Sequence, residues 1–224
     1  MTGYRVVALL SVLAGVAVVG IWFRRSKPVL IGGLLVVGAA TLVALLTGAV
    51  TPRELGLAAP HSWLATVGAA VVWTAVLIAY SPVADAVARR RFPERPDLGA
   101  FDVLRQSRIK LAAGIVVAWV LGGFLEELTF RGIVLQSVDA WLVPVLPRAV
   151  AATVAVLVAA PAAAVAHLYQ GTRAAVVIVQ LSGLLGLLMV LGGHNLWTVV
   201  ICHGLYDTVA FVRYARGTSR YAVR

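Results

Sequence analysis

Residues 111–138 read LAAGIVVAWVLGGFLEELTFRGIVLQSV, a stretch long enough to cross a bilayer as a single helix. Glu126, Glu127 and Arg131 lie within it, where apolar residues are expected. An ionised group in the hydrocarbon core costs roughly 2.5–3.5 kcal/mol on insertion scales. The stretch therefore predicts a membrane helix whose charged side chains face partners on other helices, as in a buried polar site.

The composition excludes an ordinary soluble protein. Of 224 residues, 61% are hydrophobic and 12% are charged, and the mean hydropathy is +0.96. Soluble domains are about 45–50% apolar and about 25% charged. We therefore expect an all-α integral membrane protein, whose net charge of +10 reflects membrane topology and not nucleic-acid binding. The single cysteine, Cys202, excludes an internal disulfide framework.

Apolar stretches of about 20 residues predict seven membrane spans. They cover residues 6–23, 29–50, 63–86, 111–138, 149–170, 172–192 and 195–214. The stretch 87–110 is too polar to cross, and its second half, near 98–110, is expected to form a short amphipathic helix on the membrane surface. A tight Gly171–Thr172–Arg173 connection is expected to join the fifth and sixth spans.

The distribution of basic residues sets the orientation of these spans. One side holds fifteen of them, namely Arg24, Arg25, Lys27, the seven of residues 89–110, Arg173 and the four nearest the C-terminus. The other side holds Arg5, Arg53 and Arg148. Basic residues gather on the cytoplasmic side, so we expect the N-terminus outside and the C-terminus in the cytoplasm. Arginine in place of lysine, with abundant Ala, Val and Gly, suggests a bacterial plasma membrane.

Helical spacing divides the charged residues of the fourth span between two faces. Glu127 and Arg131 are four residues apart, so they stack on one face and can form an ion pair. Glu126 is rotated by about 100° and faces a different neighbour. Glu127 and Arg131 would then be structural support, with Glu126 as the free carboxylate. A purely structural cluster of all three is the alternative reading.

Ionisable residues on two later spans complete the predicted site between the fourth, fifth and seventh spans. His203 and Asp207 are four residues apart on the seventh, and His167 lies late in the fifth. At 1.5 Å per residue, Glu126, His203 and Asp207 come to similar depths in the bilayer. His167 comes out about 9 Å deeper than Glu126, a difference that a tilted or shorter fifth helix would close.

Charge counting raises the question of a metal ion. Three ionised acids opposed by Arg131 alone would give this site a charge of −2, which a low-dielectric interior does not hold. Either a divalent cation neutralises the site or one or two carboxyls carry a proton. By ligand type, zinc is the first guess, and its candidate ligands are His167, His203, Asp207 and Glu126. A metal-free glutamate site fits the sequence as well.

Together, these residues resemble the signature of the CPBP intramembrane proteases. That family includes the type II CAAX prenyl endopeptidases and the Abi proteins of bacteriocin processing and immunity. Its three motifs are Glu-Glu-x-x-x-Arg, Phe-x-x-x-His, and His-x-x-x-Asn or Asp. They match Glu126 to Arg131, His167, and His203 to Asp207, in order and on separate helices. The second motif departs from the family, because Ala163 stands where the family has phenylalanine.

The resemblance implies a division of the chain and a set of catalytic roles. Residues 1–108 would be N-terminal helices with a basic loop, 109–214 the catalytic helical core, and 215–224 a basic tail. The implied reaction is hydrolysis of a peptide bond in a membrane-associated protein or peptide. In the mechanism that the resemblance implies, Glu126 is the general base and His167 helps to hold the water. His203 and Asp207 stabilise the intermediate or bind a metal that does so.

Two other functions fit parts of the sequence. A non-proteolytic scaffold or immunity protein would keep the charged residues for structure alone. A proton-coupled transporter would use buried Glu, His and Arg as a proton relay, although the sequence has no inverted repeat or interrupted helix pair of the kind transporters have. The substrate and the oligomeric state are left open by the sequence.

Overall fold

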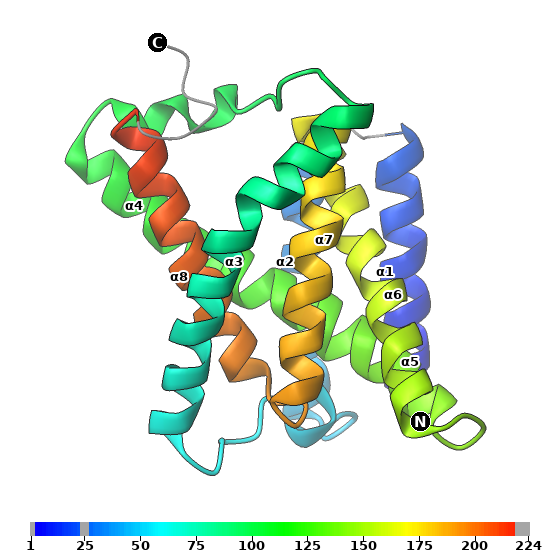
Figure 1. Cartoon of the computed structure of the whole chain (residues 1–224). Coiled ribbons are helices and arrows are strands. Elements are labelled where there is room, and N and C mark those ends of the chain that lie inside the picture. The colour runs from blue at the N-terminus through cyan, green and yellow to red at the C-terminus, as the bar shows by residue number, and fades with distance from the viewer. Residues whose placement is uncertain (1–2, 23–26, 218–224) are drawn as a thin grey trace.

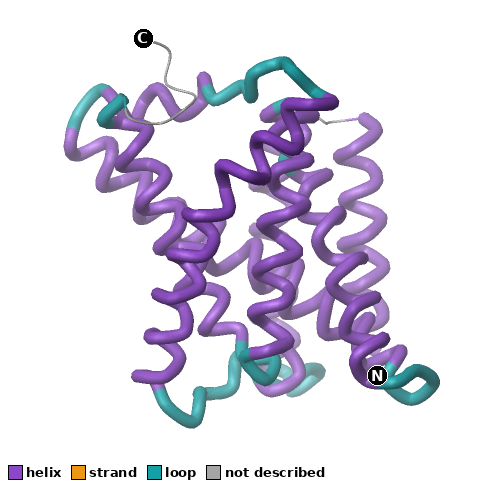
Figure 2. Tube along the Cα trace, viewed as in Figure 1, coloured by secondary structure: helices purple, strands orange, loops and turns teal. Residues whose placement is uncertain are grey.

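The computed structural model describes residues 3–22 and 27–217, and within these ranges every regular element is helical (Figure 2). The α-helices are α1 Gly3–Trp22, α2 Lys27–Leu46, α3 Trp63–Arg91, α4 Arg108–Ala118, α5 Gln136–Leu142, α6 Arg148–Ala166, α7 Thr172–Leu191 and α8 Leu196–Ala215. The π-helical segments η3 Trp119–Glu126 and η4 Leu128–Leu135 join α4 to α5. Short 3₁₀ turns are η1 Arg53–Leu55, η2 Gly99–Arg105 and η5 Leu168–Gln170.

These helices form one bundle that confirms the all-α membrane class. Five helices of the described chain are long and apolar enough to span a bilayer, including the continuous helix Arg108–Leu142. α1 contains a shorter apolar helix, Gly3–Val18. α8 is 20 residues long but carries His203, Asp207 and Arg213, which lower its mean hydropathy. α1 begins at one end of the bundle and α8 finishes at the other (Figure 1).

Two predicted boundaries were wrong. The fourth predicted span, 111–138, is part of the longer helix Arg108–Leu142, which runs obliquely through the bundle (Figure 1). The fifth, 149–170, ends as an α-helix at Ala166, and η5 and Gly171 then turn the chain into α7. Gly171 has φ 95°, a left-handed backbone conformation that favours glycine.

The polar segment between α3 and α4 lies over one end of the bundle (Figure 1), and the helix predicted near residues 98–110 is present there only as the shorter 3₁₀ helix η2. Only η2 is helical there, and α4 begins at Arg108 behind Ser107, whose hydroxyl accepts the Lys110 N–H at 3.2 Å. On η2, Asp102 accepts a hydrogen bond from the Tyr214 hydroxyl at 2.6 Å. This segment is therefore fixed to α8 by a side-chain contact that its own sequence pattern does not reveal.

Glycines bring the π-helical segment η3 close to α8. A Cβ added to Gly204 would lie 2.5 Å from ring carbons of Trp119, and one added to Gly123 would lie 3.4 Å from the Val200 carbonyl oxygen. The Trp119 indole N–H donates to Thr208 Oγ1 at 3.0 Å, which fixes the ring against α8. Because Gly123 and Gly204 have no side chains, α8 can approach the helix Arg108–Leu142 closely enough for the polar residues of the two helices to make contact.

Arg173 does not behave as the loop charge that the sequence predicted. It lies in the first turn of α7, is buried, and donates to Asp85 of α3 with Nε at 2.8 Å and Nη2 at 2.6 Å. This bidentate ion pair ties α7 to α3. Arg5, predicted on the opposite side, is also buried and donates to the Gln136 carbonyl and to Ser137 Oγ. Arg24 and Arg25 lie outside the described residues, as does most of the predicted tail 215–224.

The crossing of η3 and α8 gives a stability prediction. Gly204→Ala forces a methyl group into the fixed Trp119 ring, and overpacking of this kind costs about 1–3 kcal/mol. Thermal unfolding of the purified protein in detergent should therefore show a lower Tm. Gly183→Ala on α7, whose added Cβ meets nothing within 4 Å, is the control and should lose no stability. Equal melting temperatures for wild type and Gly204→Ala would contradict this packing.

Candidate active site

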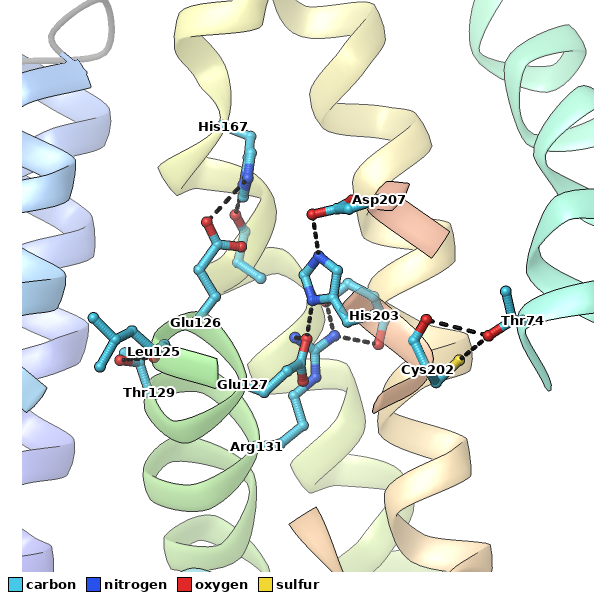
Figure 3. Close-up of polar contacts among 12 residues, drawn as sticks. Thr74, Leu125, Glu126, Glu127, Thr129, Arg131, His167, Cys202, His203 and Asp207 are labelled. Carbon is cyan, nitrogen blue, oxygen red and sulfur yellow. Dashed lines mark hydrogen bonds and ion pairs between the residues drawn. The ribbon is translucent and has the colours of Figure 1, made fainter. Parts of the chain in front are cut away.

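Four ionisable side chains from three helices meet in two pairs (Figure 3). Glu126, at the end of η3, points toward His167, the residue that follows α6, with 3.6 Å between Oε1 and Nε2. Asp207 and His203, one turn apart on α8, are also 3.6 Å apart, between Oδ2 and Nε2. The structure thus brings together all four residues that the sequence proposed as catalytic.

A third group lies beneath these pairs and holds His203 in place. Glu127 Oε1 accepts hydrogen bonds from Arg131 Nη1 at 3.1 Å and from His203 Nδ1 at 2.6 Å. The predicted Glu127–Arg131 ion pair is therefore present. The contact between Glu127 and His203 was not predicted: Glu127 binds Nδ1 of His203, and Asp207 faces its Nε2.

Exposure separates the two adjacent glutamates. The Glu127 side chain is 0% exposed, and that of Arg131 is 3% exposed. The Glu126 and His167 side chains keep 13% and 15% exposure. Glu127 is thus sealed within protein, whereas Glu126 is open to the adjoining cavity. This difference in exposure agrees with the prediction that Glu126 and Glu127, about 100° apart around the helix, face different neighbours.

The hydrogen-bond partners assign the ring nitrogens of both histidines. His167 Nδ1 lies 2.8 Å from the Ala163 carbonyl oxygen, which can only accept, so Nδ1 carries the proton. The Nε2 of His167 then faces Glu126. His203 Nδ1 likewise carries a proton, because Glu127, paired with Arg131, is an acceptor. Its Nε2 is left to face Asp207 and the cavity.

The depth difference expected for His167 does not prevent its contact with Glu126. α6 ends at Ala166 and does not continue as a helix to residue 170. The helix Arg108–Leu142 is longer than a bilayer requires and runs obliquely (Figure 1), and Glu126 near its middle lies 3.6 Å from His167, the residue that follows α6. Depth counted along straight, upright helices was therefore wrong for this pair.

A cavity of about 920 Å³ adjoins the site. Glu126, His167, His203 and Asp207 line it, together with Ala163, and Glu127 does not. Most of its other lining is apolar and comes from α2, α3, α4, α7 and α8, while Leu98, Phe101 and Leu104 of the segment between α3 and α4 close one end. A mainly apolar cavity with a few convergent polar groups is the usual form of a substrate site.

The candidate zinc ligands do not converge as a tetrahedral site requires. They form two separate pairs, and in residues 3–22 and 27–217 no group of three or more His, Cys, Asp or Glu side chains is arranged to hold a metal ion. In this arrangement the residues do not fit a zinc site. Instead of a metal ion, Arg131 supplies positive charge near the acids, and the Nδ1–H groups of His167 and His203 supply hydrogen-bond donors.

Sequence reasoning missed one buried residue of this site. Ser182 of α7 accepts from Arg131 Nη2 with its hydroxyl at 2.6 Å and with its carbonyl at 2.8 Å. No charge or motif marks Ser182, which lies in an ordinary apolar helix. An amphipathic pattern could not have identified it either, since the neighbouring residues are apolar on both sides.

The fold and the site define a helical membrane protein with two acid–histidine pairs on the wall of a cavity. Residues 108–209 match the model of a protein family described as type II CAAX prenyl endopeptidase Rce1-like. This match confirms the resemblance to the CPBP and CAAX proteases, and with it the predicted enzyme class, a CAAX-type protease. No curated protein and no solved structure matches the chain.

The two glutamates should differ in their effect on stability. Glu127→Gln leaves the Arg131 charge buried without an ionised partner, and breaking a buried pair costs about 3–5 kcal/mol. Glu126→Gln removes only the longer contact with His167 at the cavity and should change stability by less than about 1 kcal/mol. Melting temperatures of the two purified variants test this. A larger loss for Glu126→Gln would contradict the division of roles.

Proposed function

We propose that the protein is an intramembrane endopeptidase that hydrolyses a peptide bond of a membrane-associated protein or peptide, with water activated by Glu126. The observation that supports this most is the cavity itself. Glu126 and His167 reach it beside His203 and Asp207, while Glu127 remains buried behind them. A base and a donor thus face one space in which a peptide carbonyl could bind.

In the first step, Glu126 acts as a general base. The carboxylate takes a proton from water, and the water oxygen attacks the carbonyl carbon of the scissile peptide bond. His167, in the neutral tautomer that carries its proton on Nδ1, accepts a hydrogen bond at Nε2 from the second O–H of the water and orients the molecule. The carbonyl π electrons move to the carbonyl oxygen, which becomes the oxyanion of a tetrahedral intermediate.

In the second step, His203 stabilises that oxyanion. With Nδ1 bonded to Glu127, a protonated His203 presents Nε2–H to the cavity and to Asp207. Its charge also reduces the net charge of the ionised site from −2 to −1. Glu126 then gives its proton to the leaving nitrogen, the C–N bond breaks, and a new carboxyl and a new amine terminus are released.

The proposal includes a topology of seven spans in the plasma membrane, with the N-terminus outside and the C-terminus in the cytoplasm. α1 and α8 would cross in addition to the five helices that are long and apolar enough to span a bilayer. The support is the excess of basic residues at one end, where Arg89, Arg90 and Arg91 close α3. The site then lies within the membrane, and the segment between α3 and α4 covers one end of its cavity.

The substrate we propose is a leader peptide or a terminus of a membrane protein. In a bacterium this class is favoured over prenylated CAAX proteins, a eukaryotic substrate class. Ala163, in place of the family phenylalanine, lines the cavity and takes less of its volume than an aromatic ring would. A bulky side chain next to the scissile bond therefore has room beside His167.

Comparison of protein termini in cell membranes tests the proposed activity. A set of cleaved termini present with wild type should disappear both in a deletion strain and with Glu126→Gln. Ser137→Ala, a buried change at a residue that does not line the cavity, serves as the control and should keep them. The scaffold alternative predicts instead unchanged termini and a deletion phenotype that Glu126→Gln fully rescues.

The proposed mechanism is metal-free, which gives a separate prediction. Cleavage by the purified protein in liposomes should continue at an unchanged rate after treatment with 1,10-phenanthroline and EDTA. Elemental analysis should find well below one equivalent of zinc per chain. Loss of activity on chelation and its return on adding Zn²⁺ would show that His167, His203, Asp207 and Glu126 rearrange to bind the metal.

A further inference from the structure

We infer that Ser182 is a positioning residue for the proposed reaction, acting on His203 through Arg131 and Glu127. This inference rests on the proposed function and concerns a residue outside the three sequence motifs. Ser182 lies on α7, is 4% exposed, and lines the same cavity as the four candidate catalytic residues.

The contacts form one continuous path across three helices. Ser182 Oγ accepts from Arg131 Nη2 at 2.6 Å, and Arg131 Nη1 donates to Glu127 Oε1 at 3.1 Å. The same Glu127 oxygen accepts from His203 Nδ1 at 2.6 Å. A shift of the guanidinium therefore moves the oxygen that sets the orientation of the His203 ring.

The serine hydroxyl controls the orientation of the guanidinium. Within the described residues Arg131 Nε has no hydrogen-bond partner, so the plane of the group is set by Nη1 and Nη2 alone. Nη2 has two acceptors, the Ser182 carbonyl and the Ser182 hydroxyl. Any residue at position 182 supplies the carbonyl, and only a hydroxyl side chain supplies the second, shorter bond.

The same path explains why one oxygen of Glu127 is used twice. Glu127 Oε2 is buried and has no hydrogen-bond partner in the described residues, so Oε1 carries both contacts. A partial rotation of this carboxylate would move Oε1 away from His203 Nδ1. The Arg131 fork, fixed at its far end by Ser182, opposes that rotation.

Cleavage kinetics of the purified protein in liposomes test the inference, with a substrate peptide identified from the terminal comparison. Ser182→Ala should lower kcat about tenfold, the order of one hydrogen bond to a charged group, with KM within about twofold of wild type. Ser182→Thr keeps the hydroxyl and should restore most of kcat. Ser137→Ala is the matched control, because Ser137 is also a buried serine that accepts from an arginine, Arg5.

A double variant separates positioning from general stability. In an Arg131→Lys background, whose single ammonium cannot bridge Glu127 and Ser182 as the fork does, Ser182→Ala should cause no further loss of kcat. Wild-type kcat in Ser182→Ala, an equal loss in Ser137→Ala, no rescue by Ser182→Thr, or additive losses with Arg131→Lys would each overturn the inference. Absence of cleavage by the wild-type protein would overturn the proposed function, and this inference with it.

Discussion

The site depends on a single buried carboxylate oxygen, Glu127 Oε1, which bonds both Arg131 and His203. Two charges removed from water repay their desolvation only with good geometry and further hydrogen bonds. Here the further bonds come from two other helices, His203 on α8 and Ser182 on α7. The pair therefore joins three helices beside the cavity, and it fixes the orientation of the His203 ring.

Much of this arrangement could be predicted from helical spacing alone. A separation of four residues predicted the contact between Glu127 and Arg131, and the rotation between adjacent residues placed Glu126 on another face. Both features persist although the segments on either side of Glu127 are π-helical. The apolar stretches likewise predicted all seven of the long helices in the described chain, because hydropathy reports burial in lipid directly.

The rest depends on tertiary contacts that leave no periodic signal. The bond from His203 to Glu127 joins residues 76 positions apart, and that from Arg131 to Ser182 joins residues 51 apart. The Arg173–Asp85 pair was missed for a related reason, since a basic residue beside a predicted turn reads as a loop charge. The close approach of Gly204 to Trp119 can likewise be recognised only once the packing of the two helices is known.

Chemical rescue tests the central claim, that a carboxylate at position 126 on the cavity wall activates the water. The measurement is the cleavage rate of Glu126→Ala protein with and without added sodium formate. The cavity should admit formate beside His167, and a slow but measurable rate should return. Glu127→Ala should not be rescued, because its site is sealed from the cavity. Wild-type cleavage by Glu126→Ala without formate, or rescue of Glu127→Ala alone, would contradict the account.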